Sequence, residues 1–213
     1  MLQPRKMKYD KAGPKVAENL RKRHFDAYYF STREEAAAKV MELIDAGDTV
    51  SWGGSMTVDE LGIKDLLRQR GQKLIDRDSA KTAEERTELM RRGLTADTFL
   101  TGSNAITESG ELYNIDGNGN RVAAMIFGPK SVIVVAGMNK VVSDMDEAYA
   151  RVRHYTAPQV VQRFPQAKTP CNVNGMCADC RGEDCCCCYM VQTRVCRPAG
   201  KIKVVLIGED LGL

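Results

Sequence analysis

The chain has 213 residues, enough for one domain with a substantial apolar core, and its 31 basic and 28 acidic residues give a net charge of +3. This near balance, without a basic stripe or interleaved aromatic residues, argues against nucleic acid as a partner. The N-terminus lacks the apolar run of a signal peptide, and no apolar segment approaches the ~20 residues that cross a bilayer, so we expect a cytoplasmic protein without a membrane span.

Short apolar runs alternate with helical patterns in the first 100 residues. The predicted strands cover residues 27–30, 49–52, 73–75 and 98–100. The predicted helices run over residues 15–24 with Pro14 in the first turn, from a capping box at 31–34 to Gly47, from about 56 to 69, and from a capping box at 82–85 to Gly93. This alternation indicates an α/β fold with a mainly parallel sheet flanked by helices.

Two further apolar runs, 122–127 and 132–136, are predicted to be buried strands because they are short, rich in Val and Ile, and bounded by Gly and Pro. Helices are predicted at 144–155 and 156–164, and a last strand at 202–207. All eight cysteines fall between Cys171 and Cys196. We therefore expect a single α/β domain over residues 1–213, with a Cys-rich insert at 171–196 before the last strand.

Polar, turn-prone loops stand at the ends of several predicted strands, which is where open α/β sheets bind ligands. Two glycines after the 49–52 strand permit a tight turn that directs helix N–H groups at an anion; alternatively, Ser55 simply caps that helix. Together the loops predict a site for an anionic small molecule. Its candidate residues are Gly53, Gly54, Ser55, Thr101, Gly102, Ser103, Asn104, Asp116, Asn118, Asn120, Arg121, Asn139 and Lys140.

The loop at 116–121 begins like a calcium loop, with Asp and Asn at alternate positions. Arg121 stands where such a loop needs Gly, and Phe127 where it needs Glu, so calcium is excluded. The loop is interpreted instead as a tight connection in which Arg121 can bind a carboxylate or phosphate. A plain hairpin loop is the alternative.

Glu108 precedes a glycine in a predicted turn. A carboxylate presented in this way can attack a thioester and form an acyl-enzyme, so Glu108 is the candidate catalytic nucleophile. The alternative is a solvated glutamate on a surface turn.

The cysteines are spaced C-x5-C-x2-C-x4-C, with three more directly after the fourth and a last one at Cys196. The first part resembles plant-type ferredoxin ligation with one extra residue, which favours an iron–sulfur cluster with four thiolate ligands. The cofactor that we expect is a [4Fe–4S] cluster. A zinc site and disulfide bonds are the alternatives. Four consecutive cysteines cannot all face one metal, so some are spare or redox-active. The candidate metal ligands are Cys171, Cys177, Cys180, Cys185, Cys188 and Cys196.

Several segments resemble the LUD domain family, which is associated with lactate utilisation: GGS at 53–55, TGS at 101–103, LYNIDGNGNRV at 112–122, IFGPK at 126–130 and VVAGMNK at 134–140. The likeness covers most of residues 15–165 and the final 204–212. It implies a fold similar to the NagB/RpiA/CoA-transferase group. It also implies a role in oxidising L-lactate or a related 2-hydroxy acid alongside iron–sulfur subunits.

The leading interpretation is a LUD-type protein that binds an anionic substrate and holds a cluster for electron transfer, as a subunit of an iron–sulfur complex that oxidises L-lactate or a related 2-hydroxy acid. Acyl transfer by Glu108 is one alternative, and a non-catalytic binding or regulatory subunit is another. As partners we expect iron–sulfur or dehydrogenase subunits, and a second copy of the chain in a homodimer.

Overall fold

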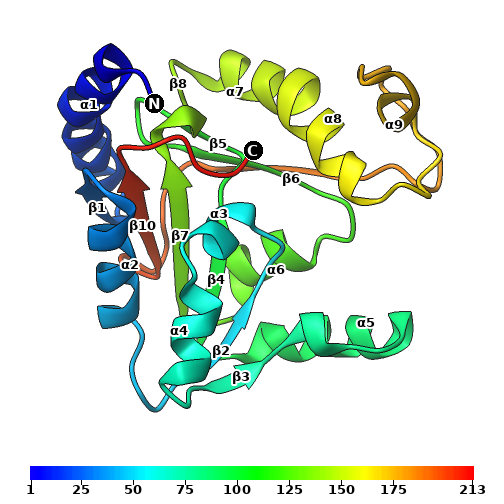
Figure 1. The fold of residues 1–213 in the computed structure, drawn as a ribbon, viewed down its shortest axis with the longest axis horizontal. Helices are drawn as coiled ribbons and strands as arrows, with labels where there is room; N and C mark the ends of the chain where they lie inside the picture. Colours follow the sequence, from blue (N-terminus) through cyan, green and yellow to red (C-terminus); the bar gives the residue numbers. More distant parts are fainter.

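Six parallel strands form the centre of the fold, in the order β1–β10–β7–β4–β2–β3 (Figure 1). The computed structural model describes residues 1–213. The strands are β1 (Asp26–Phe30), β2 (Thr49–Trp52), β3 (Lys73–Ile75), β4 (Thr98–Gly102), β7 (Ser131–Gly137) and β10 (Ile202–Ile207). The mainly parallel α/β sheet expected from the sequence is confirmed.

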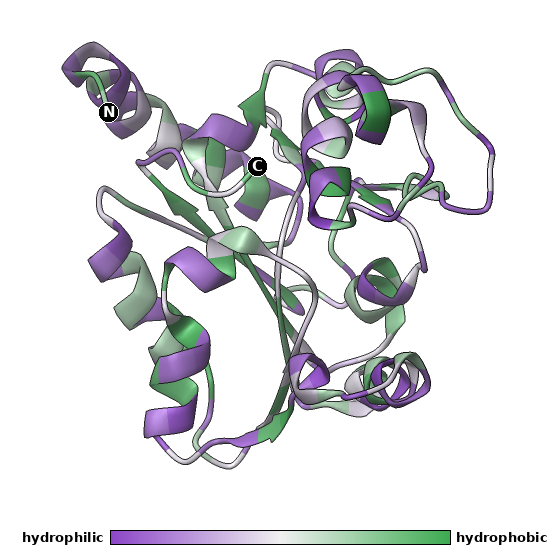
Figure 2. Cartoon of the chain, turned by 45° about the vertical axis from the view of Figure 1, so that its right-hand side comes forward, coloured by the Kyte–Doolittle hydropathy of each residue, from purple (hydrophilic) through white to green (hydrophobic).

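Helices cover both faces of this sheet, which is why its strands are almost continuously apolar. Along β7, Val132 and Val134 face a core shared with α1 (Gln3–Lys22) and α6 (Asn120–Phe127). Ile133 and Val135 face the opposite core. That second core is covered by the helices α2 (Arg33–Glu42), α3 (Met56–Glu60) and α4 (Ile63–Gln69). In Figure 2 the central strands are largely hydrophobic.

A second, smaller sheet lies beside the first, in the order β8–β5–β6–β9. Its strands are β5 (Ala105–Thr107), β6 (Leu112–Asp116), β8 (Val141–Val142) and β9 (Tyr189–Thr193). β9 belongs to the Cys-rich segment and pairs antiparallel with β6 along its whole length. This sheet was not predicted from the sequence, because its strands are short and carry no clear alternation of polar and apolar residues.

The remaining helices surround the open side of the molecule. Helix α5 (Ala83–Arg92) projects from the sheet edge and has no buried residue. The helices predicted at 144–155 and 156–164 form one helical stretch: α7 (Met145–Arg151), a π-helical turn (Val152–Thr156), α8 (Ala157–Val160) and a 3₁₀ turn (Val161–Arg163). Helix α9 (Pro170–Asn174) opens the Cys-rich segment. None of the helices is both long and apolar enough to cross a membrane.

The predicted strand at 122–127 is wrong, because these residues belong to helix α6. Asp116 begins this helix by accepting hydrogen bonds from the backbone N–H groups of Arg121 and Val122, at 3.0 and 3.1 Å. A six-residue apolar run fits a strand or a buried helical turn equally well, so periodicity alone could not distinguish them.

Two helix starts also differ from the prediction. Helix α1 begins at Gln3, and Pro14 lies in its interior rather than in its first turn. The first turns of α1 are polar and show no apolar pattern facing the core, which is why the prediction missed them. They are held in place by Asp210, which accepts hydrogen bonds from Arg5 and Tyr9, each at 2.8 Å. The capping box of α2 pairs Thr32 with Glu35, one residue later than predicted, and that helix ends before Gly47.

The helical assignment of residues 122–127 has a direct test. Met125→Ala is expected to lower the free energy of unfolding by about 2–5 kcal/mol, because Met125 is only 2% exposed in the core. Ile126→Ala is expected to change it by no more than about 0.5 kcal/mol, because Ile126 is 57% exposed. Urea denaturation of both variants measures the difference, and a large cost at Ile126 would restore the buried-strand interpretation.

Candidate functional site

A cavity of about 590 Å³ opens at the carboxyl ends of β2, β4 and β7. Figure 1 shows α5 on one side of this region and α8 with α9 on the other. Residues of α5 and of the Cys-rich segment line opposite walls of the cavity, so the segment folds back onto the strand-end loops. The structure brings these predicted site residues together in the lining: Gly54, Ser55, Gly102, Ser103, Asn104, Asp116, Asn118, Asn120, Arg121 and Lys140.

Three of the predicted site residues do not line the cavity and instead support the residues that do. Thr101 is fully buried and donates its hydroxyl to the carbonyl of Gly102. Asn139 accepts a hydrogen bond from the backbone N–H of Leu211 at 3.1 Å, which ties the C-terminal residues to the end of β7. Gly53 packs against Arg121, where a Cβ atom would come within 2.9 Å of the arginine side chain. Gly53 is therefore needed for close packing.

Ser55 accepts a hydrogen bond from the backbone N–H of Val58 at 3.3 Å and so caps α3, which was the simpler of the two interpretations of this turn.

Arg121 is a structural residue of the cavity wall. Its guanidinium donates to the side-chain oxygens of Asn114 and Asn104, at 2.7 and 2.9 Å, and to the carbonyl of Ile115 at 2.7 Å. The carboxylate that it meets is that of Asp116, with Nε 3.6 Å from Oδ1. Burial lowers the pKa of Arg121. Because its donors are already used inside the protein, Arg121 shapes the site and does not reach into it.

The loop after β6 is not a hairpin loop, since it joins a strand to helix α6. Asp116 caps that helix as described above, while Asn118 and Asn120 face the cavity.

Three arginines that the sequence analysis did not single out converge on the cavity. Arg77 follows β3, Arg86 lies on α5 and Arg163 lies after α8. A Cβ atom on Gly54 would lie 3.1 Å from Arg77 Nη2 and 3.9 Å from Arg163 Nη1, so both guanidiniums face the glycine turn. Only the fold reveals this group, because its members are distant in sequence and stand in no motif.

These arginines share few carboxylates: Arg77 and Arg86 both pair with Asp78, and Arg86 does so at 3.4 Å. The Arg77 side chain is 12% exposed, its Nε has no hydrogen-bond acceptor, and the nearest carboxylate oxygen, on Asp78, is 3.5 Å away. Burial and the neighbouring charge of Arg86 lower the pKa of Arg77. Arg163 makes no ion pair. Clustered cations with unfilled donors favour an anionic ligand.

Lys140 forms the inner end of the cavity. It is 5% exposed, and its only hydrogen bond goes to the hydroxyl of Thr57 at 2.9 Å. Burial, and then the charges of Arg151 and Arg121, lower the pKa of Lys140 to about 7. A large share of this side chain is therefore a neutral amine near neutral pH.

A second cavity, of about 210 Å³, adjoins the first, and Cys185 and Cys186 line both. Its walls carry Cys171, Cys177, Cys180, Cys185, Cys186 and Cys187. Burial, a hydrogen bond with Cys185 and the nearby thiols of Cys171 and Cys177 raise the pKa of Cys180 to about 11. The four cysteines of the C-x5-C-x2-C-x4-C pattern thus line the same small cavity.

A buried arginine supports this thiol group from the π-helical turn. Arg153 donates to Cys177 Sγ at 3.2 Å and to Asp179 at 2.6 Å. Arg153 therefore fixes the positions of both side chains beside the small cavity.

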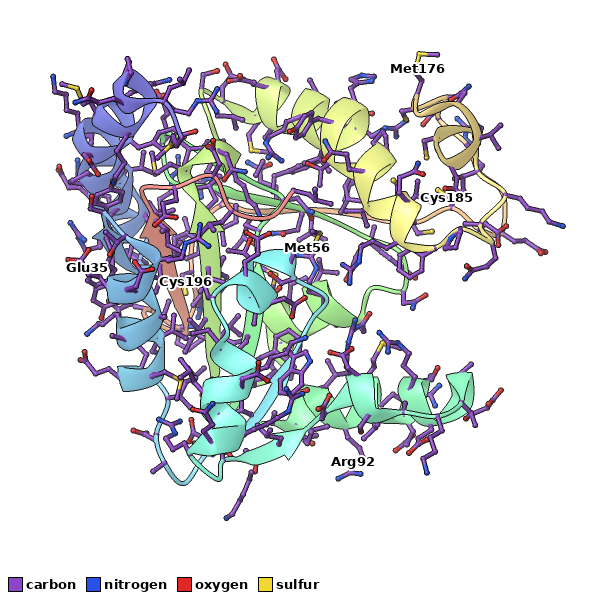
Figure 3. All side chains as sticks on the ribbon, in the orientation of Figure 1. Glu35, Met56, Arg92, Met176, Cys185 and Cys196 are labelled. Atoms are coloured by element: carbon purple, nitrogen blue, oxygen red, sulfur yellow. The ribbon has the colours of Figure 1, made fainter.

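The remaining cysteines differ in their surroundings. Cys196 is buried in the core beside β10, and Figure 3 shows it on the far side of the molecule from Cys185. Cys188 is exposed and donates to the carbonyl of Cys185. A hydrogen bond with Cys187 lowers the pKa of Cys186 to about 7 and raises that of Cys187.

The thiol group lines one small cavity. No three Cys, His, Asp or Glu side chains converge closely enough to hold one metal ion. An iron–sulfur cluster is itself several atoms wide and takes four cysteine thiolates around it. Cys171, Cys177, Cys180 and Cys185 supply that donor set around one small cavity.

Glu108 lies outside both cavities. It is exposed at the turn between β5 and β6, where its backbone contacts Asn19 of α1 and Val142 of β8. No cationic or catalytic side chain faces its carboxylate, so acyl transfer at Glu108 gains no support from its surroundings.

Residues 13–207 match the family model described as LUD domain. Lactate utilization protein B of Bacillus subtilis (strain 168) is 25% identical over 199 residues, which cover 70% of this chain and 41% of the relative. Lactate utilization protein B of Geobacillus sp. (strain WCH70) is 34% identical over 106 residues, 48% of this chain and 22% of the relative. In each case the match spans less than half of the relative's length.

Among solved structures, a DUF162 family protein from Deinococcus radiodurans superimposes with a TM-score of 0.52. The superposition covers 93% of this chain and 98% of that chain, at 12% identity. At this level of identity, the match shows a shared fold.

Lys140→Met is expected to stabilise the protein in a pH-dependent way. The folded chain releases the Lys140 proton at about pH 7, whereas the ordinary pKa is 10.5, so the unfolded state binds more protons between these values. Burying the charged Lys140 therefore lowers the free energy of unfolding by its largest amount below pH 7. The effect disappears above the ordinary pKa of 10.5, where Lys140 is neutral in both states. The gain in unfolding free energy should be a few kcal/mol, on the order of the pKa shift, at low pH, and should shrink as the pH rises.

Urea denaturation of both proteins across this pH range measures the effect. A gain that does not vary with pH would contradict the lowered pKa of Lys140.

Proposed function

The chain belongs to the LUD domain family, and from this we propose that it serves lactate utilisation by binding L-lactate or a related 2-hydroxy acid in the larger cavity. The observation that carries the proposal is the pair of guanidiniums, from Arg77 and Arg163, that face the Gly54 turn in a cavity that Lys140 also lines. An arginine fork matches the two oxygens of a carboxylate. The hydroxyl of Ser55, which lines the same cavity and has its own proton free to donate, suits the substrate hydroxyl.

A small 2-hydroxy acid fills only part of a 590 Å³ cavity. The remaining space gives a second component access to the bound acid. The curated relatives are much longer than this chain, so we propose that further subunits or domains supply that component.

We further propose that Cys171, Cys177, Cys180 and Cys185 hold a [4Fe–4S] cluster. Such a cluster, when bound, supplies one-electron transfer. Oxidation of a 2-hydroxy acid to a 2-oxo acid releases two electrons and two protons, so the electrons must pass in single steps to a partner iron–sulfur or dehydrogenase subunit. Arg153 would hold the Cys177 thiolate in place, and Cys185 lies in the wall between the two cavities.

Loss of Arg77 should weaken substrate binding. Arg77→Met is expected to lower the affinity for L-lactate about tenfold or more, because a hydrogen bond to a charged group contributes about 1.5–3 kcal/mol. Arg91→Met is the matched control, since Arg91 lies on the outer side of α5 with a side chain 72% exposed. Isothermal titration calorimetry measures both variants. An unchanged affinity in Arg77→Met, or no binding by the unsubstituted protein, would contradict the proposal.

The cluster proposal predicts which cysteines matter. Protein purified without oxygen is expected to contain about four iron and four sulfide per chain and to absorb visible light. Cys180→Ser should abolish that absorbance, and Cys188→Ser and Cys196→Ser should retain it. Metal analysis and absorption spectra test this prediction. One zinc per chain without iron would favour the zinc alternative, and the absence of both metals would contradict both the cluster and the zinc interpretation.

A further inference from the structure

Three cationic side chains are buried: Arg121, Lys140 and Arg153. Arg121 and Arg153 pair with Asp116 and Asp179, whereas Lys140 has no carboxylate partner. Lys64, for comparison, binds the carboxylates of Asp59 and Asp78, at 2.7 and 2.8 Å. Lys140 is more deeply buried than Lys64, yet its one partner is the neutral hydroxyl of Thr57. Burying an ammonium group without an opposite charge costs free energy, because the group loses its hydration. The neutral amine form is therefore favoured.

The charged groups around Lys140 act in the same direction. Arg121 faces it from α6 and Arg151 from α7, and both disfavour the ammonium. The one carboxylate that favours the ammonium is that of Glu60 on α3, whose effect is the smallest and whose oxygens accept the backbone N–H of Gly212. Arg151 is fixed by the carbonyl of Asn104 and the hydroxyl of Thr156, so it cannot turn away.

The space around the amine is kept clear by two glycines. A Cβ atom on Gly102 would lie 3.8 Å from Lys140 Nζ, and one on Gly212 would lie 3.1 Å away. Thr57 accepts one N–H and donates its own hydroxyl toward the carbonyl of Leu211, at 3.4 Å. The lone pair of the neutral amine is therefore not used by Thr57.

We propose that Lys140 is a nucleophilic amine that condenses with the carbonyl carbon of a 2-oxo acid held in the same cavity. The proposal rests on the proposed function, since a 2-oxo acid is the oxidised form of the 2-hydroxy acid and carries the same carboxylate. Arg77 and Arg163, which line the same cavity, are the cations proposed to meet that carboxylate.

The step is a condensation without oxidation. The Nζ–carbon bond forms first, and the amine then passes two protons to the former carbonyl oxygen. That oxygen leaves as water, and an imine between Lys140 and the acid remains. Hydrolysis reverses the step and releases the 2-oxo acid, so the imine holds the oxidised acid in the cavity until water returns.

Borohydride trapping tests this directly. The intact protein is incubated with pyruvate and sodium borohydride, which reduces an imine to a stable secondary amine, and the adduct is located by peptide mass spectrometry. We expect the adduct on Lys140 and none on Lys130, whose side chain is 90% exposed. The rate of labelling should rise about tenfold between pH 6 and pH 8, as the neutral fraction of an amine with a pKa near 7 requires.

Three controls test whether labelling requires Lys140 and the carboxylate of the acid. Lys140→Met should take no label, and Arg77→Met should slow labelling about tenfold through weaker binding. Acetone, which has the ketone but no carboxylate, should label far more slowly than pyruvate. Equal labelling by acetone would overturn the role of the carboxylate.

Binding and bond formation are measured separately, so the two proposals can fail separately. If calorimetry shows pyruvate binding but borohydride traps no Lys140 adduct, the inference is overturned and the proposed function stands. If neither pyruvate nor L-lactate binds, the proposed function fails, and a Lys140 adduct then cannot be attributed to the cavity's recognition of a 2-oxo acid.

Discussion

The buried guanidinium of Arg121 is the interaction on which the rest of the site depends. It comes from α6 and binds Asn104 after β4, Asn114 within β6 and the backbone of Ile115. The central sheet, the small sheet and α6 are thereby fixed to one planar group. Removing that group would leave several buried oxygens without donors, which is far more costly than the loss of one surface contact.

The small sheet in turn positions the cysteines. β6 carries part of the Arg121 interaction and also pairs with β9, the strand that directly follows the run of four cysteines. The two halves of the proposed function, an anion site and a thiol group, are thus connected through β6. Because the Cys-rich segment has few buried residues of its own, this pairing and the Arg153–Cys177 contact do much to hold it against the cavity.

The sequence predicted the central sheet well and the walls of the site only in part. Strands such as 132–136 and 202–207 were clear because runs rich in Val and Ile between turn residues suit a sheet covered on both faces. The 122–127 run was mistaken for a strand because Asp116, which caps the helix, looked like part of a hairpin loop. Arg77 and Arg163 could not have been grouped from the sequence, because they meet only through the fold. Lys140 was predicted to bind the ligand. The sequence could not show that this lysine is buried without a carboxylate partner, because the groups around it come from distant parts of the chain.

Helix α5 forms one wall of the larger cavity without contributing a buried side chain. The free energy of the two apolar cores therefore does not depend on it, and opening this helix costs much less than unfolding the sheet. The cavity thus combines an inner side anchored in the cores, where Arg121 and Lys140 lie, with an outer side of lower local stability. Opening α5 leaves the surroundings of Lys140 and Arg121 unchanged, but it moves Arg86 and breaks the contacts that Arg86 and Met90 make with Arg77.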